Sequence, residues 1–432
     1  MATPKRILIA TIGSLGDLHP CLALGLELGR RGHLVTIAST EYYRSKVEEL
    51  GIEFHSIRPN WDPTDRELIR QCEDLKRGAE VLYRKLILPG LRATYEDLIS
   101  VAVGADLMIA GELVYAAPLV AEKLSLRWVS QILSPFSFFS SHDPSILVNL
   151  PSLIHLRKLG WRTYRAGLQL GRLATRHWSK PVRHLRRELG LREDCDPVFR
   201  DKYSPDLVLA LFSRRLAEPQ PDWPRQTLQP GFVYFDRETS GGAPSPGLIA
   251  FMAAGDAPIV FTQGSTAVHN AGKFYEVSIE AAKRLGRRAV LLGAKTVPEG
   301  SSPEVLVLPY VPYSQIFPHA ALNVHQGGSG TTGQALKAGR PMLIVPYGWD
   351  QPDNAARIER LGTGLNLSRD NYSSKTATNA LHRLLREPHF ATRAAEIGAE
   401  LKEENGQSLA CDAIERLFSL ARPDREELFV NT

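Results

Sequence analysis

Residues 325–339, HQGGSGTTGQALKAG, form a glycine-rich turn between an apolar run, AALNV at 320–324, and a stretch with helical spacing. Glycines after a strand let the backbone approach a ligand closely, and the helix that follows points free N–H groups at it. The turn therefore predicts an anion site, most naturally for phosphate. It lacks the Gly-Lys-Ser/Thr of a Walker A loop, and Thr331 stands where a nucleophile elbow needs glycine.

The chain around this turn has the size and composition of a two-domain globular protein. Its 432 residues exceed the size at which one hydrophobic core keeps growing, and 43% of them are hydrophobic and 23% charged. Its four cysteines are scattered, without metal-ligand spacing, and no apolar run is long enough to span a membrane. We expect a cytoplasmic protein that is a monomer or a weak dimer.

The net charge of +5 is unevenly distributed. Residues 155–192 contain eleven Lys/Arg and one acidic residue, Glu188, so the rest of the chain is net acidic. A nucleic-acid binder would more often spread positive charge over a domain face, and we expect no nucleic-acid partner. Leucines and tryptophans recur within the segment at helical spacing, which predicts a basic amphipathic helix. Its apolar face would either pack on the first domain or make weak peripheral contact with a membrane.

Short apolar runs alternate with helical patterns along the whole chain. Strands are predicted at RILIATI, HLVTIAS, ADLMIAG, RWVSQIL, DLVLALF and GFVYF, and again at APIVFTQGS, RAVLLG, EVLVLP, ALNVHQGG and PMLIVP. This alternation is typical of parallel sheets covered by helices. We predict an α/β protein of two Rossmann-like domains facing across a cleft: 1–236, a linker at 237–247, 248–415, and a tail at 416–432 that packs back on the first domain.

The region around the turn resembles the donor-binding motif of family 1 glycosyltransferases, which are inverting, nucleotide-sugar-dependent enzymes of GT-B fold. The resemblance rests on the spacing of YVPY, HQGG, GRP and WDQPDNA. The run DQPDNA is particularly similar to that of bacterial glycolipid rhamnosyltransferases. GSLGDLHP near the N-terminus also resembles this superfamily, including sterol and antibiotic-aglycone transferases. The resemblance of both regions implies transfer of a hexose from UDP-glucose or a dTDP-sugar to a hydroxyl of a small apolar acceptor, with no metal or other cofactor.

The resemblance also implies roles for individual residues of the donor site. Tyr310 would stack on the nucleobase, with Val311 and Tyr313 presenting backbone groups to its edge. His325 would contact the diphosphate, Asp350 and Gln351 would hold sugar hydroxyls, and Trp349 would wall the sugar pocket. Asp350 also has the spacing of a helix N-cap. The remaining predicted donor-site residues are Gly16, Gln263, Gly264, Ser265, Gly327, Gly328, Ser329, Gly330 and Thr331.

One position departs from the family pattern. Many members carry a ribose-binding Glu eight residues after the motif histidine, whereas this chain has Gly333 there, with Gln334 beside it. The choice between uridine and thymidine donors therefore stays open.

GSLGDLHP is expected to supply the catalytic base. Inverting transfer needs a group that takes the acceptor proton as the hydroxyl attacks the anomeric carbon. Asp17 occupies the position that carries the base in relatives, and a helix N-terminus would favour its ionised form. It is also a residue type preferred for helix capping. His19 is the rival, and two residues apart on a helix the pair cannot face one point. The AGE run ending at Glu112 shows no counterpart of the aspartate that orients a histidine base in relatives.

Aromatic residues in loops predict the acceptor site. Trp61, Phe136, Phe138 and Phe139 would line an apolar pocket for a lipid, sterol, polyphenol or polyketide, unless they are ordinary core residues. Two other functions remain open at this stage. One is a nicotinamide-dependent oxidoreductase, with Glu41 as the ribose acid although GxGxxG is absent. The other is a catalytically silent sugar-nucleotide-binding partner.

Overall fold

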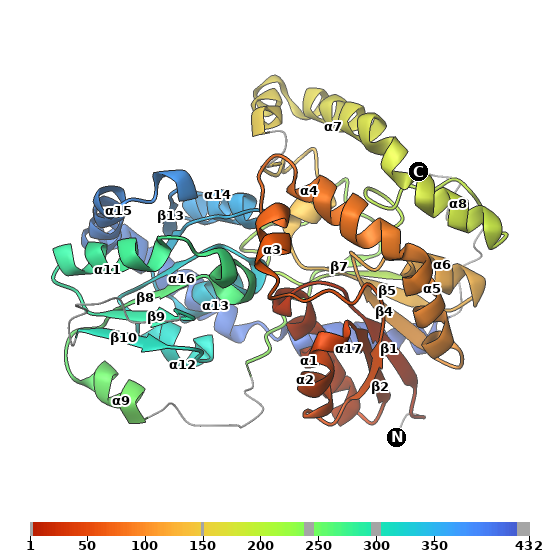
Figure 1. Cartoon of the computed structure of the whole chain (residues 1–432), viewed down its shortest axis with the longest axis horizontal. Coiled ribbons are helices and arrows are strands. Elements are labelled where there is room, and N and C mark those ends of the chain that lie inside the picture. Colours follow the sequence, from red (N-terminus) through yellow and green to blue (C-terminus); the bar gives the residue numbers. More distant parts are fainter. Residues whose placement is uncertain (1–2, 148–150, 237–245, 295–303, 421–432) are drawn as a thin grey trace.

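The computed structural model describes residues 3–147, 151–236, 246–294 and 304–420, which fold into two α/β domains lying side by side (Figure 1). The N-terminal domain contains a fully parallel sheet in the order β3-β2-β1-β4-β5-β6-β7. Its strands are β1 Arg6–Ala10, β2 Leu34–Ser39, β3 Glu53–Ser56, β4 Leu107–Gly111, β5 Trp128–Ile132, β6 Leu207–Ala210 and β7 Thr227–Leu228.

Helices cover both faces of this sheet because its central strands are apolar on both sides and fully buried. The helices of this part of the chain are α1 Leu15–Arg30, α2 Arg44–Glu48, α3 Arg66–Cys72, α4 Gly78–Val81, α5 Leu88–Ala102, α6 Ala117–Lys123, α7 Trp161–Thr175 and α8 Lys180–Glu188. Shorter helical turns are η1 Glu41–Tyr43, η2 Leu82–Ile87, η3 Pro135–Phe138, η4 Pro151–Leu159 and η5 Arg176–Ser179.

The C-terminal domain has a second parallel sheet, in the order β10-β9-β8-β11-β12-β13. Its strands are β8 Ile259–Thr262, β9 Ala289–Leu292, β10 Val305–Leu308, β11 Leu322–His325, β12 Met342–Ile344 and β13 Gly364–Asn366. From residue 246 onward the described helical elements are α9 Pro246–Ala253, α10 Gly264–Ala267, η6 Val268–Asn270, α11 Phe274–Arg284, α12 Tyr313–Ile316, η7 Phe317–His319, α13 Ser329–Ala338, α14 Gln351–Leu361, η8 Arg369–Asn371, α15 Ser374–Arg386, α16 Pro388–Glu403 and α17 Gly406–Ser419. The predicted fold class is confirmed.

Three details of the predicted element map are wrong. GFVYF, residues 231–235, forms no strand and instead runs extended from one domain to the other, and β3, β7 and β13 were not predicted. The basic segment 155–192 is not one helix either. Gly160, with φ of +99°, separates η4 from α7, and further turns separate α7 from α8. Most of the predicted linker, 237–247, lies outside the described residues.

The last described helix, α17, returns to the N-terminal domain (Figure 1). Cys411 and Ile414 are fully buried in the same apolar cluster as β1 and α1. Arg31 pairs with Asp412 at 2.6 Å and with Glu415 at 2.7 Å. The return to the first domain therefore begins near residue 406 rather than at 416, and the predicted boundary at 415/416 falls inside α17. Residues 421–432 of the predicted tail lie outside the described part.

A buried ion cluster joins the two domains near the cleft. Arg357 on α14 is 2% exposed and donates to Asp353 at 2.8 Å; it also contacts Asp143 in the loop after η3. The second oxygen of Asp353 accepts from the backbone N–H of Ile146 at 2.9 Å. The loop after η3 is thereby bound to the C-terminal domain. None of the helices in the described ranges has the length and apolarity needed to cross a bilayer.

Candidate active site

The candidate active site has one part on each domain, and each part lies where the strand order of its sheet reverses. In the first sheet the chain leaves β1 toward β2 on one side and β4 on the other, and in the second it leaves β8 toward β9 and β11. Open parallel sheets bind ligands at the carboxyl ends of the strands at such points. Asp17 and Glu112 follow β1 and β4, while Gln263 and His325 stand at the ends of β8 and β11. The topology thus brings together residues that are distant in the sequence.

Asp17 folds back over the turn that precedes its helix. The N–H of Ser14 donates to its Oδ2 at 2.7 Å and the Ser14 hydroxyl at 3.2 Å, which completes a capping box at the start of α1. The carboxylate lies directly over Gly13, whose φ is +147°, and a Cβ on Gly13 would be 2.2 Å from Oδ2. Gly13 is therefore required for this position of the carboxylate.

Burial, together with the negative charges of Glu112 and Asp350, raises the pKa of Asp17 to about 7 against the hydrogen bonds from Ser14. The expectation that the helix N-terminus favours the ionised form is thus outweighed by desolvation. Asp350 belongs to the other domain, so its effect places the two carboxyls in one electrostatic neighbourhood across the cleft. A carboxyl with pKa near neutrality is well suited to accept a proton.

Glu112 was not predicted as a site residue. Its two oxygens accept from the Ser137 hydroxyl at 2.8 Å and from Lys202 at 3.1 Å. Lys202 is itself 7% exposed and lies over the ring of Phe139, 4.9 Å from its centroid. No sequence signal pairs Glu112 with Lys202, since 90 residues separate them. The pair sets a fixed charge pattern between Asp17 and the aromatic loop.

His19 packs against the segment that crosses between the domains. Its ring contacts Phe235 with centroids 5.1 Å apart, and burial lowers its pKa to about 3, with Lys46 contributing. The two residues therefore occupy different surroundings, as their helical spacing predicts.

His325 is fully buried at the end of β11. The N–H of Gly327 donates to its Nδ1 at 3.1 Å, which assigns the proton of the neutral ring to Nε2. Nε2 has no hydrogen-bond partner among the described residues. Burial lowers the pKa of His325 to about 3, so the ring is a neutral donor at physiological pH. It can contribute one N–H to an anionic ligand.

The start of α13 is tied to the start of α14. The Ser329 hydroxyl donates to Asp350 Oδ2 at 2.6 Å, and Asn354 Nδ2 donates to the same oxygen and to the carbonyl of Gly327, each at 2.9 Å. Burial raises the pKa of Asp350 to about 6 against these bonds. Asp350 occupies the N-cap position of α14 but makes no side-chain capping bond. Its carboxylate is oriented toward the glycine loop.

The two residues on either side of Asp350 in the sequence also belong to this part of the site, at the starts of α13 and α14. Gln351 Oε1 accepts from the N–H groups of Tyr347 and Gly348 at 2.7 and 3.2 Å, so its carbonyl holds the turn and only its amide N–H groups remain for a ligand. Trp349 has a φ of +60°, a sparsely populated backbone conformation for a bulky residue. Such strain is concentrated at functional sites. The Trp349 side chain packs against the core of the other domain.

Further buried polar atoms of the second domain have no hydrogen-bond partner among the described residues. Both amide atoms of Gln263, Gln326 Oε1, the Thr332 hydroxyl and Asn354 Oδ1 belong to this group. Gly264, with φ of +65°, approaches the Gln326 side chain, where an added Cβ would lie 2.2 Å from Nε2. Buried polar groups are normally paired, so this cluster favours a polar ligand at the edge of the second sheet.

The residues predicted to contact the nucleobase differ in how far they are exposed to solvent. Tyr310 is 50% exposed, whereas Tyr313 stacks on Phe317 at 4.3 Å and Val311 is buried. Gly333 packs against Phe232, whose ring carbons would lie 2.8 Å from an added Cβ. There is no room for a glutamate at that position, which explains the departure from the family pattern.

The aromatic residues predicted to contact the acceptor also differ in burial. Phe138 is 6% exposed and stacks on Trp223 at 4.1 Å, so it serves the core. Phe136 and Phe139 are partly exposed and contact each other, with centroids 5.8 Å apart. Trp61 is partly buried, and its indole N–H has no partner among described residues. Phe136, Phe139 and Trp61 remain the acceptor candidates.

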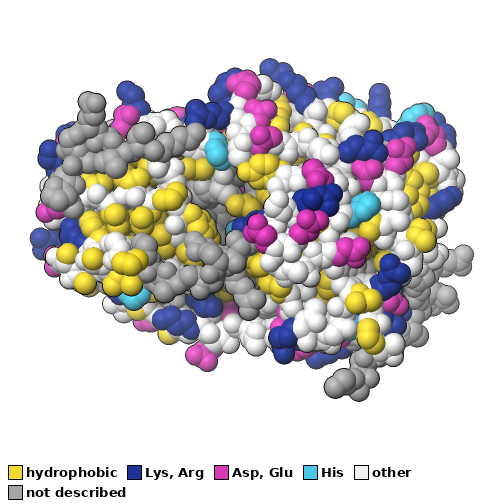
Figure 2. All heavy atoms as spheres, turned by 60° about the horizontal axis from the view of Figure 1, so that its bottom comes forward, with side chains coloured by type: hydrophobic (Ala, Val, Ile, Leu, Met, Phe, Trp, Pro, Cys, Tyr) yellow, Lys and Arg dark blue, Asp and Glu magenta, His cyan; other side chains and the backbone are white. Residues whose placement is uncertain are grey.

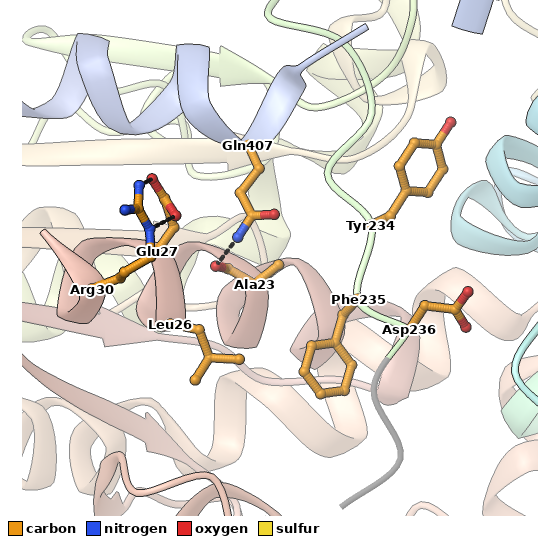
Figure 3. Close-up of a pocket in the computed structure, with 8 residues that line it drawn as sticks. All are labelled: Ala23, Leu26, Glu27, Arg30, Tyr234, Phe235, Asp236 and Gln407. Carbon is orange, nitrogen blue, oxygen red and sulfur yellow. Dashed lines mark hydrogen bonds and ion pairs between the residues drawn. The ribbon is translucent and has the colours of Figure 1, made fainter. Parts of the chain in front are cut away.

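A cavity of about 390 Å³ lies away from this cleft, at the crossing between domains (Figure 3). Tyr234, Phe235 and Asp236 of the crossing segment line it, with Gln407 of α17 and α1 residues, including the Glu27–Arg30 ion pair. Gln407 donates to the carbonyl of Ala23 at 2.7 Å. None of the predicted site residues lines this cavity.

Comparisons with known proteins match both halves of the chain. Residues 7–136 match the glycosyltransferase family 28 N-terminal domain, and residues 291–411 match the erythromycin biosynthesis protein CIII-like C-terminal domain. The chain is 31% identical to the O-mycaminosyltylonolide 6-deoxyallosyltransferase of Streptomyces fradiae, over 95% of this chain and 97% of that protein. It is 28% identical to the sterol 3-beta-glucosyltransferase of Yarrowia lipolytica, but spans only 30% of that protein.

Solved structures of similar fold agree with this. The spinosyn forosaminyltransferase superposes with a TM-score of 0.71 at 19% identity, over 97% of this chain and 100% of that one. The glycosyltransferase VinC, solved in complex with dTDP, superposes with a TM-score of 0.69 at 20% identity, over 96% of this chain and 100% of that one.

Proposed function

The chain belongs to the family 1 glycosyltransferases of GT-B fold, and we propose that it is an inverting hexosyltransferase that uses a nucleotide diphosphate sugar without a metal ion. Glycosyltransferase activity follows from the family. The comparisons do not favour an oxidoreductase. The mechanism and the donor are the proposal, and one observation supports it: the negative charge of Asp350, from the C-terminal domain, adds to the burial that raises the pKa of Asp17.

On the acceptor side, Asp17 takes the proton of the acceptor hydroxyl. The oxygen's electron pair forms a bond to the anomeric carbon, while the bond from that carbon to the diphosphate oxygen breaks and its electrons leave with the diphosphate. A single displacement of this kind inverts the anomeric configuration. The carboxyl with pKa about 7 supports Asp17 as the base, because a useful fraction is ionised at neutral pH.

On the donor side, the leaving diphosphate gains negative charge. The Nε2–H of His325 and the N–H groups of Ser329, Gly330 and Thr331 at the start of α13 would bind it. This helix has ten residues and its N-cap, Gly328, makes no side-chain capping bond. Preorganised neutral donors of this kind support leaving-group departure without a metal.

The sugar would lie between Asp350, Gln351 and Trp349, and the base would stack on Tyr310. The donors we propose are UDP-glucose or a dTDP-sugar. The acceptor we propose is a small apolar molecule with a free hydroxyl, of the sterol or polyketide class, because two relatives are by name an O-mycaminosyltylonolide 6-deoxyallosyltransferase and a sterol 3-beta-glucosyltransferase. Phe136 and Phe139 would contact it.

The test is an assay of the purified chain with UDP-glucose and dTDP-glucose against a panel of macrolide and sterol acceptors, in buffer containing EDTA. We expect a mass increase of one hexosyl residue and a β-linked product from the α-linked donor, read from the anomeric proton coupling. An α-linked product would refute inversion. Activity that appears only on addition of a divalent metal would refute metal independence.

A further inference from the structure

The helical hairpin formed by η4 and α7 carries two distinct apolar surfaces. Its inner surface packs: Tyr164 is 1% exposed, and Gly167 lies so close to Leu153 and Leu156 that a Cβ would approach within 2.6 and 2.9 Å. The Tyr164 hydroxyl donates to the carbonyl of Ser145 at 3.2 Å. The Gly167 contacts close the hairpin on itself, and Tyr164 holds α7 to the loop after η3, along the upper edge of the molecule in Figure 1.

The outer surface is apolar as well. Leu170 is 69% exposed and Leu173 62%, and with Ala166 they follow the spacing of one helical stripe. Leu159 and Trp161 add 71% and 41% exposed side chains at the bend between η4 and α7. Because separate residues serve the core and the outside, packing on the domain leaves this outer stripe available.

A basic stripe runs beside the apolar one. Arg162, Arg165, Arg172 and Arg176 recur at spacings of three, seven and four residues, with Gln169 filling the gap, and α7 contains no acidic residue. Arg172 contacts Asp196, but in the described part of the chain no ion pair engages Arg162 or Arg165. On the face shown in Figure 2, by contrast, acidic and basic side chains are interspersed over the N-terminal domain. Arg162 and Arg165 of α7 therefore carry positive charge that no ion pair within the described residues neutralises.

We infer that the outer face of α7, defined by Leu159, Trp161, Arg162, Arg165, Leu170 and Leu173, binds the surface of an anionic lipid bilayer. A helix with an apolar stripe flanked by arginines lies in the plane of such an interface, with its leucines in the acyl boundary and its guanidinium groups at the phosphates. A convex single helix with one sign of charge fits a planar anionic surface. The occupant is identified by that charge complementarity.

The hairpin is connected to the cleft. Trp161 stacks on His142 at 4.9 Å, and the loop from Ser140 to Ile146 is bound to α14 through Asp143 and Arg357. The same loop follows Phe136 and Phe139, the acceptor candidates. Binding at α7 would therefore hold the acceptor side of the cleft near the bilayer, which deepens the proposed use of an apolar acceptor without depending on which nucleotide sugar is used.

The test is co-sedimentation of the full chain with vesicles of phosphatidylcholine, with and without phosphatidylglycerol, at low and high salt. We expect binding to the anionic vesicles only, weakened by salt. Arg162→Gln with Arg165→Gln should reduce partitioning roughly 30-fold and flatten its salt dependence, at about one kcal/mol for each basic residue near the surface. Leu170→Ser with Leu173→Ser should reduce binding but leave its salt dependence unchanged.

Matched controls change equally exposed residues elsewhere. Lys375→Gln with Lys402→Gln, and Val103→Ser with Leu409→Ser, should bind vesicles like the wild type. Transfer to a water-soluble acceptor should be unchanged in every variant, which separates this inference from the proposed function. Absence of binding to anionic vesicles at low salt would overturn the inference. Self-association that depends on Leu170 and Leu173, measured by sedimentation velocity without vesicle binding, would assign the face to a second copy instead.

Discussion

The hydroxyl of Ser329 donates to the carboxylate of Asp350 at 2.6 Å, so the first residue of α13 and the residue before α14 form one unit. In the proposed site this bond couples the phosphate-binding helix terminus to the sugar-binding carboxylate. Ligand contacts made by one residue thereby orient the other.

Ser329→Ala should separate sugar recognition from diphosphate binding. The N–H of residue 329 remains, so affinity for the sugar-free nucleotide diphosphate should change little, whereas kcat/KM for the nucleotide sugar should fall about ten-fold or more as Asp350 loses its hydrogen bond. Calorimetry and initial rates measure the two effects. Ser329→Thr, which keeps the hydroxyl, is the control. Equal losses in both measurements would show that Ser329 does not act through Asp350.

His325→Ala should weaken binding of the nucleotide diphosphate by about 1.5–3 kcal/mol, since a donor to an anionic oxygen is lost. Because burial holds the pKa of His325 near 3, the loss should be the same at about pH 6 and about pH 8. His319→Ala, an exposed histidine of the same domain, should have no effect. A loss that grows as the pH falls would contradict the neutral ring, and unchanged affinity would remove His325 from the site.

Gly13→Ala should abolish transfer because a methyl group there meets the carboxylate of Asp17. Gly32→Ala is the matched control: its φ is also positive, +94°, but no atom lies within 4 Å of an added Cβ. Both variants should lose about 1–2 kcal/mol of unfolding free energy from backbone strain, and only the first should lose activity. Equal activity of the two would show that the position of Asp17 over Gly13 is unimportant.

Asp17→Asn should raise the free energy of unfolding at about pH 8. Since the folded pKa is raised from 3.8 to about 7, the folded state binds the proton more tightly, and the wild type loses stability as pH rises between these values. The amide cannot ionise, so the gain should be roughly 2–4 kcal/mol at about pH 8 and vanish below about pH 4. Urea denaturation at both pH values measures it. A variant equally stable to the wild type at high pH would contradict a raised pKa.

The sequence predicts most of the fold because buried parallel strands are continuous apolar runs. RILIATI and ADLMIAG became β1 and β4. GFVYF has the same composition, yet it crosses between domains, where Phe232 packs on Gly333 and Phe235 on His19. Its apolar residues meet tertiary partners rather than strands, and composition alone does not distinguish the two.

The candidate site could be predicted where the motif is local and not where it is assembled by topology. The glycine turn, Asp350 and Asp17 are visible in short stretches. The Glu112–Lys202 pair joins β4 to a distant loop, and Phe138 enters the core only because Trp223 lies opposite it. The direction of the Asp17 pKa shift likewise depends on burial and on carboxylates from two other segments.

The base assignment is tested most directly by the pH dependence of kcat/KM for the wild type, Asp17→Asn and His19→Ala, with donor affinity measured in parallel. Wild-type kcat/KM should rise through about pH 7, as Asp17 ionises. Asp17→Asn should lose transfer by roughly a hundred-fold or more while keeping donor affinity, and His19→Ala should keep the wild-type profile. Near wild-type turnover in Asp17→Asn, together with loss of activity in His19→Ala, would contradict the account.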